Sequence, residues 1–274
     1  MKRGKKGIAG VLINAFLLIC VAALILSGTA LVRTLSEYRA GADSYARLRH
    51  AAAVRTVSPN ITARDRAPTF DACDTAAESA AAMESTAAPP PAIDFGALRA
   101  INGDVAAWLR CPGTNIDYPV VQGADNSRYL RRLITGEYNR SGTLFIDSRN
   151  RAFADRNTVI YGHNMRDQSM FWTLLRYQKQ AFYDGRPTMR ISVPEGEYTV
   201  ELFAGYIASP DDGAWKREFA DDAEFEVWLG LARSRSMFDS GVQVGAGDRV
   251  VTLSTCAYNF PGAKYVVLGK LVQE

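Results

Sequence analysis

A long run without a single charged side chain, residues 7–32, limits the possible folds of this chain more than any other feature. About 20 apolar residues cross a bilayer core as a helix, because a helix satisfies its own backbone hydrogen bonds in lipid. Among residues 8–26, Asn14 is the one clearly polar side chain. Lysines and arginines at residues 2–6 favour a cytoplasmic N-terminus. The sequence therefore predicts a basic tail and transmembrane anchor over residues 1–32.

A cleaved signal peptide is the alternative interpretation of this run. Residues 27–30, Ser-Gly-Thr-Ala, form a weak small-residue cleavage site. The apolar stretch exceeds the roughly 7 to 15 residues of a signal-peptide core, which favours an uncleaved single-pass anchor. The rest of the chain is then expected outside the cytoplasmic membrane.

Two segments separate the anchor from the expected globular domain. Residues 33–66 are basic at first and form a juxtamembrane segment, with its arginines facing lipid headgroups or water. Its apolar residues recur at helical spacing: Leu35, Tyr38, Ala42, Tyr45, Leu48 and Ala52. Residues 67–92 are rich in alanine and proline and lack lysine and arginine. Such a composition buries too little apolar area to offset the entropy lost on ordering, which predicts a flexible stalk that holds the domain off the membrane.

The folded domain is expected over residues 93–274 and is mainly β, a barrel or a sandwich with peripheral helices. Apolar residues of 95–109 recur at intervals of mostly three and four, which indicates a helical segment interrupted around Asn102-Gly103-Asp104. The expected strands are residues 115–121, 143–147, 157–161, 188–193, 198–207, 249–255 and 264–272. The expected helices are residues 169–177 and 221–235.

Charge and cysteine content exclude some classes of function. The net charge of +3 is small and spread along the chain, so it gives no argument for a nucleic-acid partner. The chain has four cysteines and neither a CxxC motif nor a Cys/His cluster, so no metal site or cofactor is expected. Cys73 and Cys111 remain as a possible disulfide pair if Cys256 is a free thiol and Cys20 lies in the membrane.

Two β-branched stretches each end at a residue that can take part in nucleophilic catalysis. Residues 250–256 deliver Cys256 to the end of an expected strand, and residues 157–161 are followed by His163. A thiolate is the nucleophile in cysteine enzymes, and a nearby imidazole raises its fraction at neutral pH. The other histidine, His50, lies in the basic segment near the anchor. Taken separately, Cys256 also fits a buried core residue and His163 a structural one.

Four motifs in this chain, in this order, resemble those of the class B sortases of Gram-positive bacteria. They are Thr-Asn-Ile-Asp-Tyr-Pro-Val-Val-Gln-Gly at 114–123, Tyr-Gly-His-Asn-Met at 161–165, Thr-Leu-Ser-Thr-Cys at 252–256 and Tyr-Val-Val-Leu-Gly-Lys-Leu at 265–271. The resemblance covers roughly residues 93–274. It implies the eight-stranded sortase β-barrel, with the helix of residues 221–235 in the long loop typical of class B.

The resemblance also implies a membrane-anchored cysteine transpeptidase. Cys256 would attack a C-terminal sorting signal of a secreted protein after a threonine and form an acyl thioester, while His163 protonates the leaving amine. A peptidoglycan amine would then release the acyl group. The implied partners are thus sorting-signal proteins, the peptidoglycan amine and the cytoplasmic membrane, with no cofactor.

Lys264 departs from the family, in which an arginine at this position is associated with the oxyanion. Lysine keeps the positive charge but lacks the planar two-pronged donor, so it acts only as a point charge. The alternatives are a slower enzyme, another donor such as Arg249, an inactive relative, or a solvated lysine.

Ser254 is expected on the same side of its strand as Cys256 and is a candidate substrate contact, although an ordinary strand hydroxyl explains it equally well. Tyr258 and Phe260 either wall the groove or fill the core.

Two other functions remain open at this stage. A hydrolytic cysteine peptidase uses the same groups, but papain-like enzymes place the cysteine before the histidine, and here His163 precedes Cys256. A surface module that binds peptides without catalysis, or that hydrolyses them weakly, is supported only by Lys264.

Overall fold

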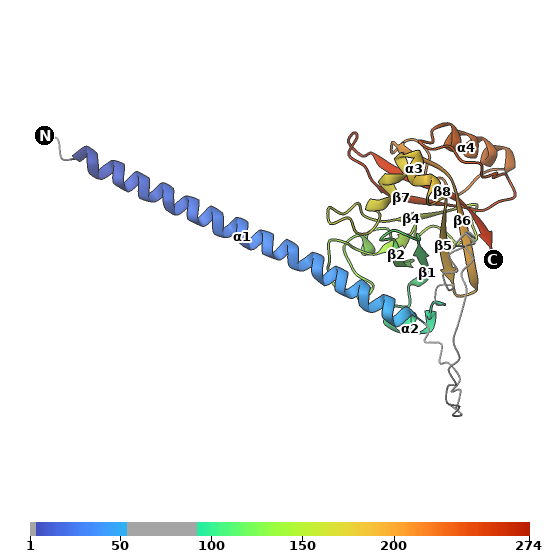
Figure 1. The fold of residues 1–274 in the computed structure, drawn as a ribbon, viewed down its shortest axis with the longest axis horizontal. Helices are drawn as coiled ribbons and strands as arrows, with labels where there is room; N and C mark the ends of the chain where they lie inside the picture. Colours follow the sequence, from blue (N-terminus) through green and yellow to red (C-terminus); the bar gives the residue numbers. More distant parts are fainter. Residues whose placement is uncertain (1–3, 54–91) are drawn as a thin grey trace, which may run out of the picture.

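A computed structural model describes residues 4–53 and 92–274, which form a closed eight-stranded β-barrel and one long N-terminal helix (Figure 1). The strands are β1 (Val105–Arg110), β2 (Asp117–Val121), β3 (Leu144–Ile146), β4 (Asn157–Tyr161), β5 (Thr188–Val193), β6 (Gly196–Ala208), β7 (Val250–Cys256) and β8 (Lys264–Gln273). They follow one another around the barrel as β1-β2-β3-β4-β7-β8-β6-β5. The expected mainly β fold is confirmed, and the barrel matches the one that the resemblance implied.

The pair of β4 and β7 is parallel, and both strands are buried over nearly their whole length. All residues of the two strands are buried except the last of each, Tyr161 and Cys256. Strands covered on both faces read as continuous β-branched runs rather than as alternating ones, which explains the sequences of these two strands. The barrel interior covers one face. Helix α4 (Asp222–Ser234) covers part of the outer surface with Phe225, Trp228 and Leu229.

The N-terminal part of the domain differs from the helical prediction. Helix α2 spans only Phe95–Ile101, and the next residues form strand β1. The side-chain oxygen of Asn102 accepts the N–H of Asp104 at 2.9 Å, and its amide donates to the carbonyl of Ile134 at 2.8 Å. This local turn ends the helix, and β1 then pairs with both β2 and β5. The prediction of helix beyond this turn was wrong, because pairing with two strands outweighs the helical spacing of a few apolar residues.

The expected helix at residues 169–177 is a 3-10 helix, η2 (Trp172–Gln178), and a short helix follows it, α3 (Gln180–Asp184). A second 3-10 turn, η1 (Arg128–Leu130), lies in the connection between β2 and β3. Both connections contribute residues around the C-terminal end of β4.

Helix α1 (Gly4–Ala52) runs without a break through the predicted anchor and into the juxtamembrane segment (Figure 1). Among the described residues it is the one helix long and apolar enough to cross a membrane. Its C-terminal part packs against the barrel. The hydroxyl of Tyr45 donates to the carbonyl of Gly142, and its ring meets Tyr118 edge to face with centroids 5.0 Å apart. Asn139 donates from its side-chain amide to the carbonyl of Glu37 at 2.8 Å.

The predicted stalk, except for residue 92, lies outside the described residues. The segments on the two sides of the undescribed range contact each other. Ala53 forms an antiparallel bridge with Ile93, and the N–H of Asp94 donates to the carbonyl of Ala52 at 2.8 Å. Helix α1 thus meets the start of the barrel domain directly, and the interpretation of residues 67–92 as a flexible stalk stays a prediction.

A buried asparagine at the start of β4 fixes this strand against its neighbours. The side-chain oxygen of Asn157 accepts the hydroxyl proton of Thr252 at 2.8 Å, and its amide donates to the carbonyl of Lys216, also at 2.8 Å. The first contact joins β4 to β7, and the second joins β4 to the connection between β6 and α4. Asn157 is fully buried, so both contacts are shielded from water.

We predict that Asn157→Ala lowers the free energy of unfolding by about 2–4 kcal/mol, because it leaves two polar groups without partners in a shielded environment. Urea denaturation followed by tryptophan fluorescence measures the change. The exposed Asn259 provides the control, and Asn259→Ala should change the free energy by less than about 0.5 kcal/mol. Equal effects of the two substitutions would contradict the role given to Asn157.

Candidate active site

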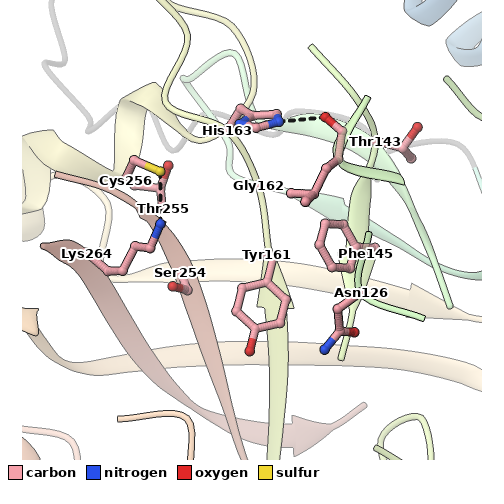
Figure 2. Close-up of a pocket in the computed structure, with 11 residues that line it drawn as sticks. Asn126, Thr143, Phe145, Tyr161, Gly162, His163, Ser254, Thr255, Cys256 and Lys264 are labelled. Atoms are coloured by element: carbon pink, nitrogen blue, oxygen red, sulfur yellow. Dashed lines mark hydrogen bonds between the residues drawn. The ribbon is translucent and has the colours of Figure 1, made fainter. Parts of the chain in front are cut away.

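The C-terminal ends of β4 and β7 open into one pocket of about 270 Å³. The parallel register pairs Tyr161 with Ser254, and the N–H of Gly162 donates to the carbonyl of Ser254 at 3.1 Å. The two strands therefore end at the same level of the barrel, about 5 Å apart. His163 and Cys256, each two residues further on, both line the pocket, as Figure 2 shows.

The side chain of Asn164 connects the segment that follows β4 to the end of β7. Its amide donates to the carbonyl of Cys256 at 3.0 Å. The sulfur of Cys256 is half-buried and faces the pocket, not the barrel core. A thiol and an imidazole that are 93 positions apart in the sequence (256 minus 163) thus share one accessible cavity.

A backbone carbonyl orients the imidazole of His163. Its Nε2 lies 2.6 Å from the oxygen of Leu130, in η1. Because a carbonyl oxygen can only accept, Nε2 carries the proton and donates it, which leaves Nδ1 as the nitrogen that can exchange a proton. Sequence patterns gave no signal for Leu130, since any residue supplies a carbonyl.

Lys264 lies directly beside the candidate nucleophile. Cys256 and Lys264 are partners in the antiparallel register of β7 and β8, so their side chains extend from the same face of the sheet. The Nζ of Lys264 is 3.1 Å from the sulfur (Figure 2). A cation at this distance remains close to any carbonyl oxygen that the sulfur attacks.

Arg249, the alternative donor suggested by the sequence, lies at the opposite end of β7. It lies seven positions before Cys256, a distance of about 23 Å along the strand. Its guanidinium donates to the carbonyl of Phe153 at 2.9 Å and lies over the ring of Tyr198. The interpretation of Arg249 as an oxyanion donor is therefore wrong.

Ser254 lines the pocket on the same side as Cys256, as the two-residue alternation predicts. Its oxygen accepts a hydrogen bond from Nε1 of Trp215 at 2.9 Å. This bond leaves the hydroxyl proton of Ser254 available for a ligand in the pocket. Trp215 lies in the connection between β6 and α4, and nothing in its local sequence pointed to this contact.

A neutral phenol forms another part of the pocket wall. The hydroxyl of Tyr161 donates to Oδ2 of Asp147 at 3.1 Å, and both carboxylate oxygens accept from Arg149 at 2.9 Å. Burial opposes ionisation of Asp147, but the bonds from Arg149 outweigh it and hold the pKa of this carboxyl below its usual range. Burial, followed by the negative charge of Asp147, raises the pKa of Tyr161. Tyr161 therefore stays protonated at physiological pH.

Of the two aromatic residues after Cys256, Tyr258 is 82% exposed and Phe260 is also exposed. The interpretation that they fill the core is wrong. Tyr258 instead lines a second pocket that also contacts His163.

Cys111 is a free thiol in the structure and lies in the barrel core, 3.4 Å from the hydroxyl of Tyr177. Burial raises the pKa of the Cys111 thiol, which makes it a poor nucleophile. Its predicted partner Cys73 falls outside the described residues. Within residues 4–53 and 92–274, no group of three or more histidine, cysteine, aspartate or glutamate side chains is arranged to hold a metal ion.

Comparisons with known proteins agree on one family. The sortase domain model matches residues 109–272. Sortase B of Listeria monocytogenes is 39% identical over 180 residues, which cover 65% of this chain and 73% of the relative. The Staphylococcus aureus sortase B–substrate complex superposes with a TM-score of 0.63 at 34% identity, over 65% of this chain and 84% of that one. Clostridium perfringens sortase B superposes with a TM-score of 0.63 at 35% identity, over 65% of this chain and all of that one.

We predict that Asp147 contributes stability that is lost in acid. Its pKa is lower in the folded protein than the roughly 3.9 of an unfolded chain, so the contribution is complete above that value and declines as the pH falls below it. Asp147→Asn should therefore reduce the free energy of unfolding at pH 7 and have a progressively smaller effect at lower pH. Urea denaturation at a series of pH values measures the difference. The exposed Asp211 is the control, and a pH-independent effect of Asp147→Asn would contradict this assignment.

Proposed function

This chain belongs to the class B sortases, which are cysteine transpeptidases, and we propose that Cys256, His163 and Lys264 perform its reaction. The observation that carries the proposal is the convergence of these three side chains on one pocket, with the ammonium of Lys264 3.1 Å from the sulfur. The proposed reaction is an acyl transfer in two steps.

In the first step, the thiolate of Cys256 attacks a peptide carbonyl carbon. A carbon–sulfur bond forms, and the carbon–nitrogen bond of the peptide breaks. His163 enters this step as the imidazolium, with the thiol proton of Cys256 on the ring nitrogen that does not contact Leu130, and it donates that proton to the leaving amine nitrogen. The product on the protein is an acyl thioester.

In the second step, an amine of the acceptor attacks the thioester carbonyl. A new amide bond forms, the imidazole of His163 takes the proton from the attacking nitrogen, and the sulfur leaves as a thiolate. Lys264 balances the negative charge of the carbonyl oxygen in each tetrahedral intermediate, and that of the sulfur before the first step and after the second. Ser254 donates its hydroxyl proton to the bound peptide. Atoms and charges balance without a cofactor.

We assign the two substrates by family likeness. The first is the C-terminal sorting signal of a secreted protein, cut after a threonine, and the second is an amine of peptidoglycan. Solved relatives include a sortase B–substrate complex and a sortase B complexed with triglycine, and the latter ligand supports an amine-bearing acceptor.

The protein acts, in this proposal, as a single-pass protein of the cell membrane with its barrel outside. The apolar part of α1 is the anchor, and the basic residues 2–6 keep the N-terminus in the cytoplasm. The length and composition of α1 support this location.

We predict that the wild-type protein transfers a sorting-signal peptide to an added amine, and that Cys256→Ala abolishes both transfer and cleavage. His163→Ala should reduce the rate by about a hundredfold to ten-thousandfold, the usual contribution of a general acid–base group. Mass spectrometry of the products measures transfer and cleavage separately. Cys20→Ala, a thiol substitution in the anchor, is the control and should leave the rate unchanged.

The same assay separates the alternative functions. Cleavage without transfer would identify a hydrolytic peptidase, and binding without either product would identify a peptide-binding module. Activity that survives Cys256→Ala would remove the thiol from the mechanism.

We predict that Lys264→Met, which removes the charge at similar length, lowers kcat by about a hundredfold to a thousandfold, the cost of losing one oxyanion donor. Lys264→Arg should retain most of the activity, because it restores a cation with donors. Lys270, at the other end of β8, is the control, and Lys270→Met should change kcat less than about twofold. An unchanged rate in Lys264→Met would support the solvated-lysine interpretation instead.

A further inference from the structure

A second pocket, of about 520 Å³, lies between α1 and the candidate active site. Helix α1 contributes Thr34 and Tyr38, and the connection between β2 and β3 contributes Arg131 and Arg140. Arg166 follows β4, and His163 lines both this pocket and the active-site pocket. We refer to it as the arginine pocket.

The arginine pocket carries an excess of positive charge. Its lining includes three arginines and no carboxylate. Glu37, on α1, pairs with Arg140 at 3.0 Å and so compensates one of them. Arg131 donates to the hydroxyl of Tyr138 at 3.2 Å, a neutral partner. Within the described part of the chain, neither Arg131 nor Arg166 forms an ion pair, and both side chains are exposed. An anion in this pocket would therefore meet two unneutralised guanidinium groups.

The position of the pocket along α1 sets its depth relative to a membrane. The uncharged run ends at Val32, and Thr34 and Tyr38 follow two and six residues later. At 1.5 Å per helical residue, these side chains lie about 3 and 9 Å beyond the end of the run. The headgroup layer extends about 5–8 Å beyond the hydrocarbon core on each side. The arginine pocket thus lies at the depth of lipid phosphates.

Contacts between α1 and the barrel hold the pocket in this position. Tyr45 is buried against Tyr118, and Asn139 bonds to the backbone of α1 at Glu37. A Cβ at Gly41 would approach the side chain of Asn139 to 3.2 Å, so helix and barrel touch closely at this level. Because α1 is continuous from the apolar run into this contact, the pocket and the apolar run move as one unit.

We propose that the arginine pocket binds the phosphate of an anionic membrane lipid. The guanidinium groups of Arg131 and Arg166 pair with the phosphate oxygens, since arginine presents donors in a planar fork that matches phosphate geometry. The lipid holds the mouth of the active site against the outer surface of the bilayer, next to His163. This inference rests on the proposed membrane anchor.

The test uses the full chain, reconstituted in phosphatidylcholine discs that contain a minor fraction of photoreactive phosphatidylglycerol. Irradiation should label peptides that contain residues 131–140 and 163–166. The variant Arg131→Gln with Arg166→Gln should reduce this labelling about tenfold or more, since a direct hydrogen bond from a charged group to the phosphate adds about tenfold to the affinity. The matched control is Arg39→Gln with Arg132→Gln, which removes the same charge from exposed residues at a similar depth and should retain the labelling.

Three results would overturn the proposal. Equal loss in both double variants would indicate general attraction between basic residues and lipid. Equal labelling by photoreactive phosphatidylcholine at the same fraction would show that the net charge of the lipid is not recognised. Displacement of the probe by added inorganic phosphate would identify a site for free phosphate.

The same samples test the anchor independently. Protein that fails to co-purify with the discs would refute the membrane anchor of the proposed function, and with it the lipid assignment. Protein that co-purifies but shows no labelling dependent on Arg131 and Arg166 would refute only the pocket.

Discussion

The parallel pairing of β4 with β7 is the interaction on which the candidate active site depends. Because the two strands run in the same direction and in register, both deliver their next residues to one end of the barrel. Antiparallel pairing with β8 then adds Lys264 opposite Cys256. Asn157 secures the other end of the same pair through Thr252. Backbone hydrogen bonds between strands thus bring His163 next to Cys256 and Lys264, although 93 positions separate the histidine from the cysteine (256 minus 163).

Hydrogen bonds between polar groups hold the side chains around the pocket in fixed orientations. The carbonyl of Leu130 selects the tautomer of His163, and Trp215 occupies one acceptor site of Ser254. Asp147, held ionised by Arg149, in turn fixes the phenol of Tyr161. Each group has its hydrogen-bond role determined before a ligand arrives, which reduces the reorganisation that binding and reaction require.

Sequence patterns predicted those parts of the fold in which local preference and tertiary packing agree. The bounds of β4 and β5 match the expected strands, because β-branched residues in both are also buried in the barrel. Strand β1 was missed, since the spacing of Val105, Trp108 and Leu109 fits a helix as well as a strand paired on both edges. The positions of His163 and Cys256 could be predicted from strand ends and family motifs, but their shared register could not. Leu130 and Trp215 contribute through contacts between distant segments, for which no local pattern exists.

Under the proposed membrane anchor, the continuity of α1 through the end of its apolar run would let the bilayer influence the orientation of the barrel. The uncharged run would measure about 39 Å as a straight helix, longer than the roughly 30 Å of a hydrocarbon core. Such a mismatch is relieved by tilting. Helix α1 has no break between its apolar run and Glu37, which contacts the barrel through Asn139. A change in the tilt of the helix would therefore tilt the whole barrel domain. Local membrane thickness would then set the angle between the bilayer and the opening of the candidate active-site pocket.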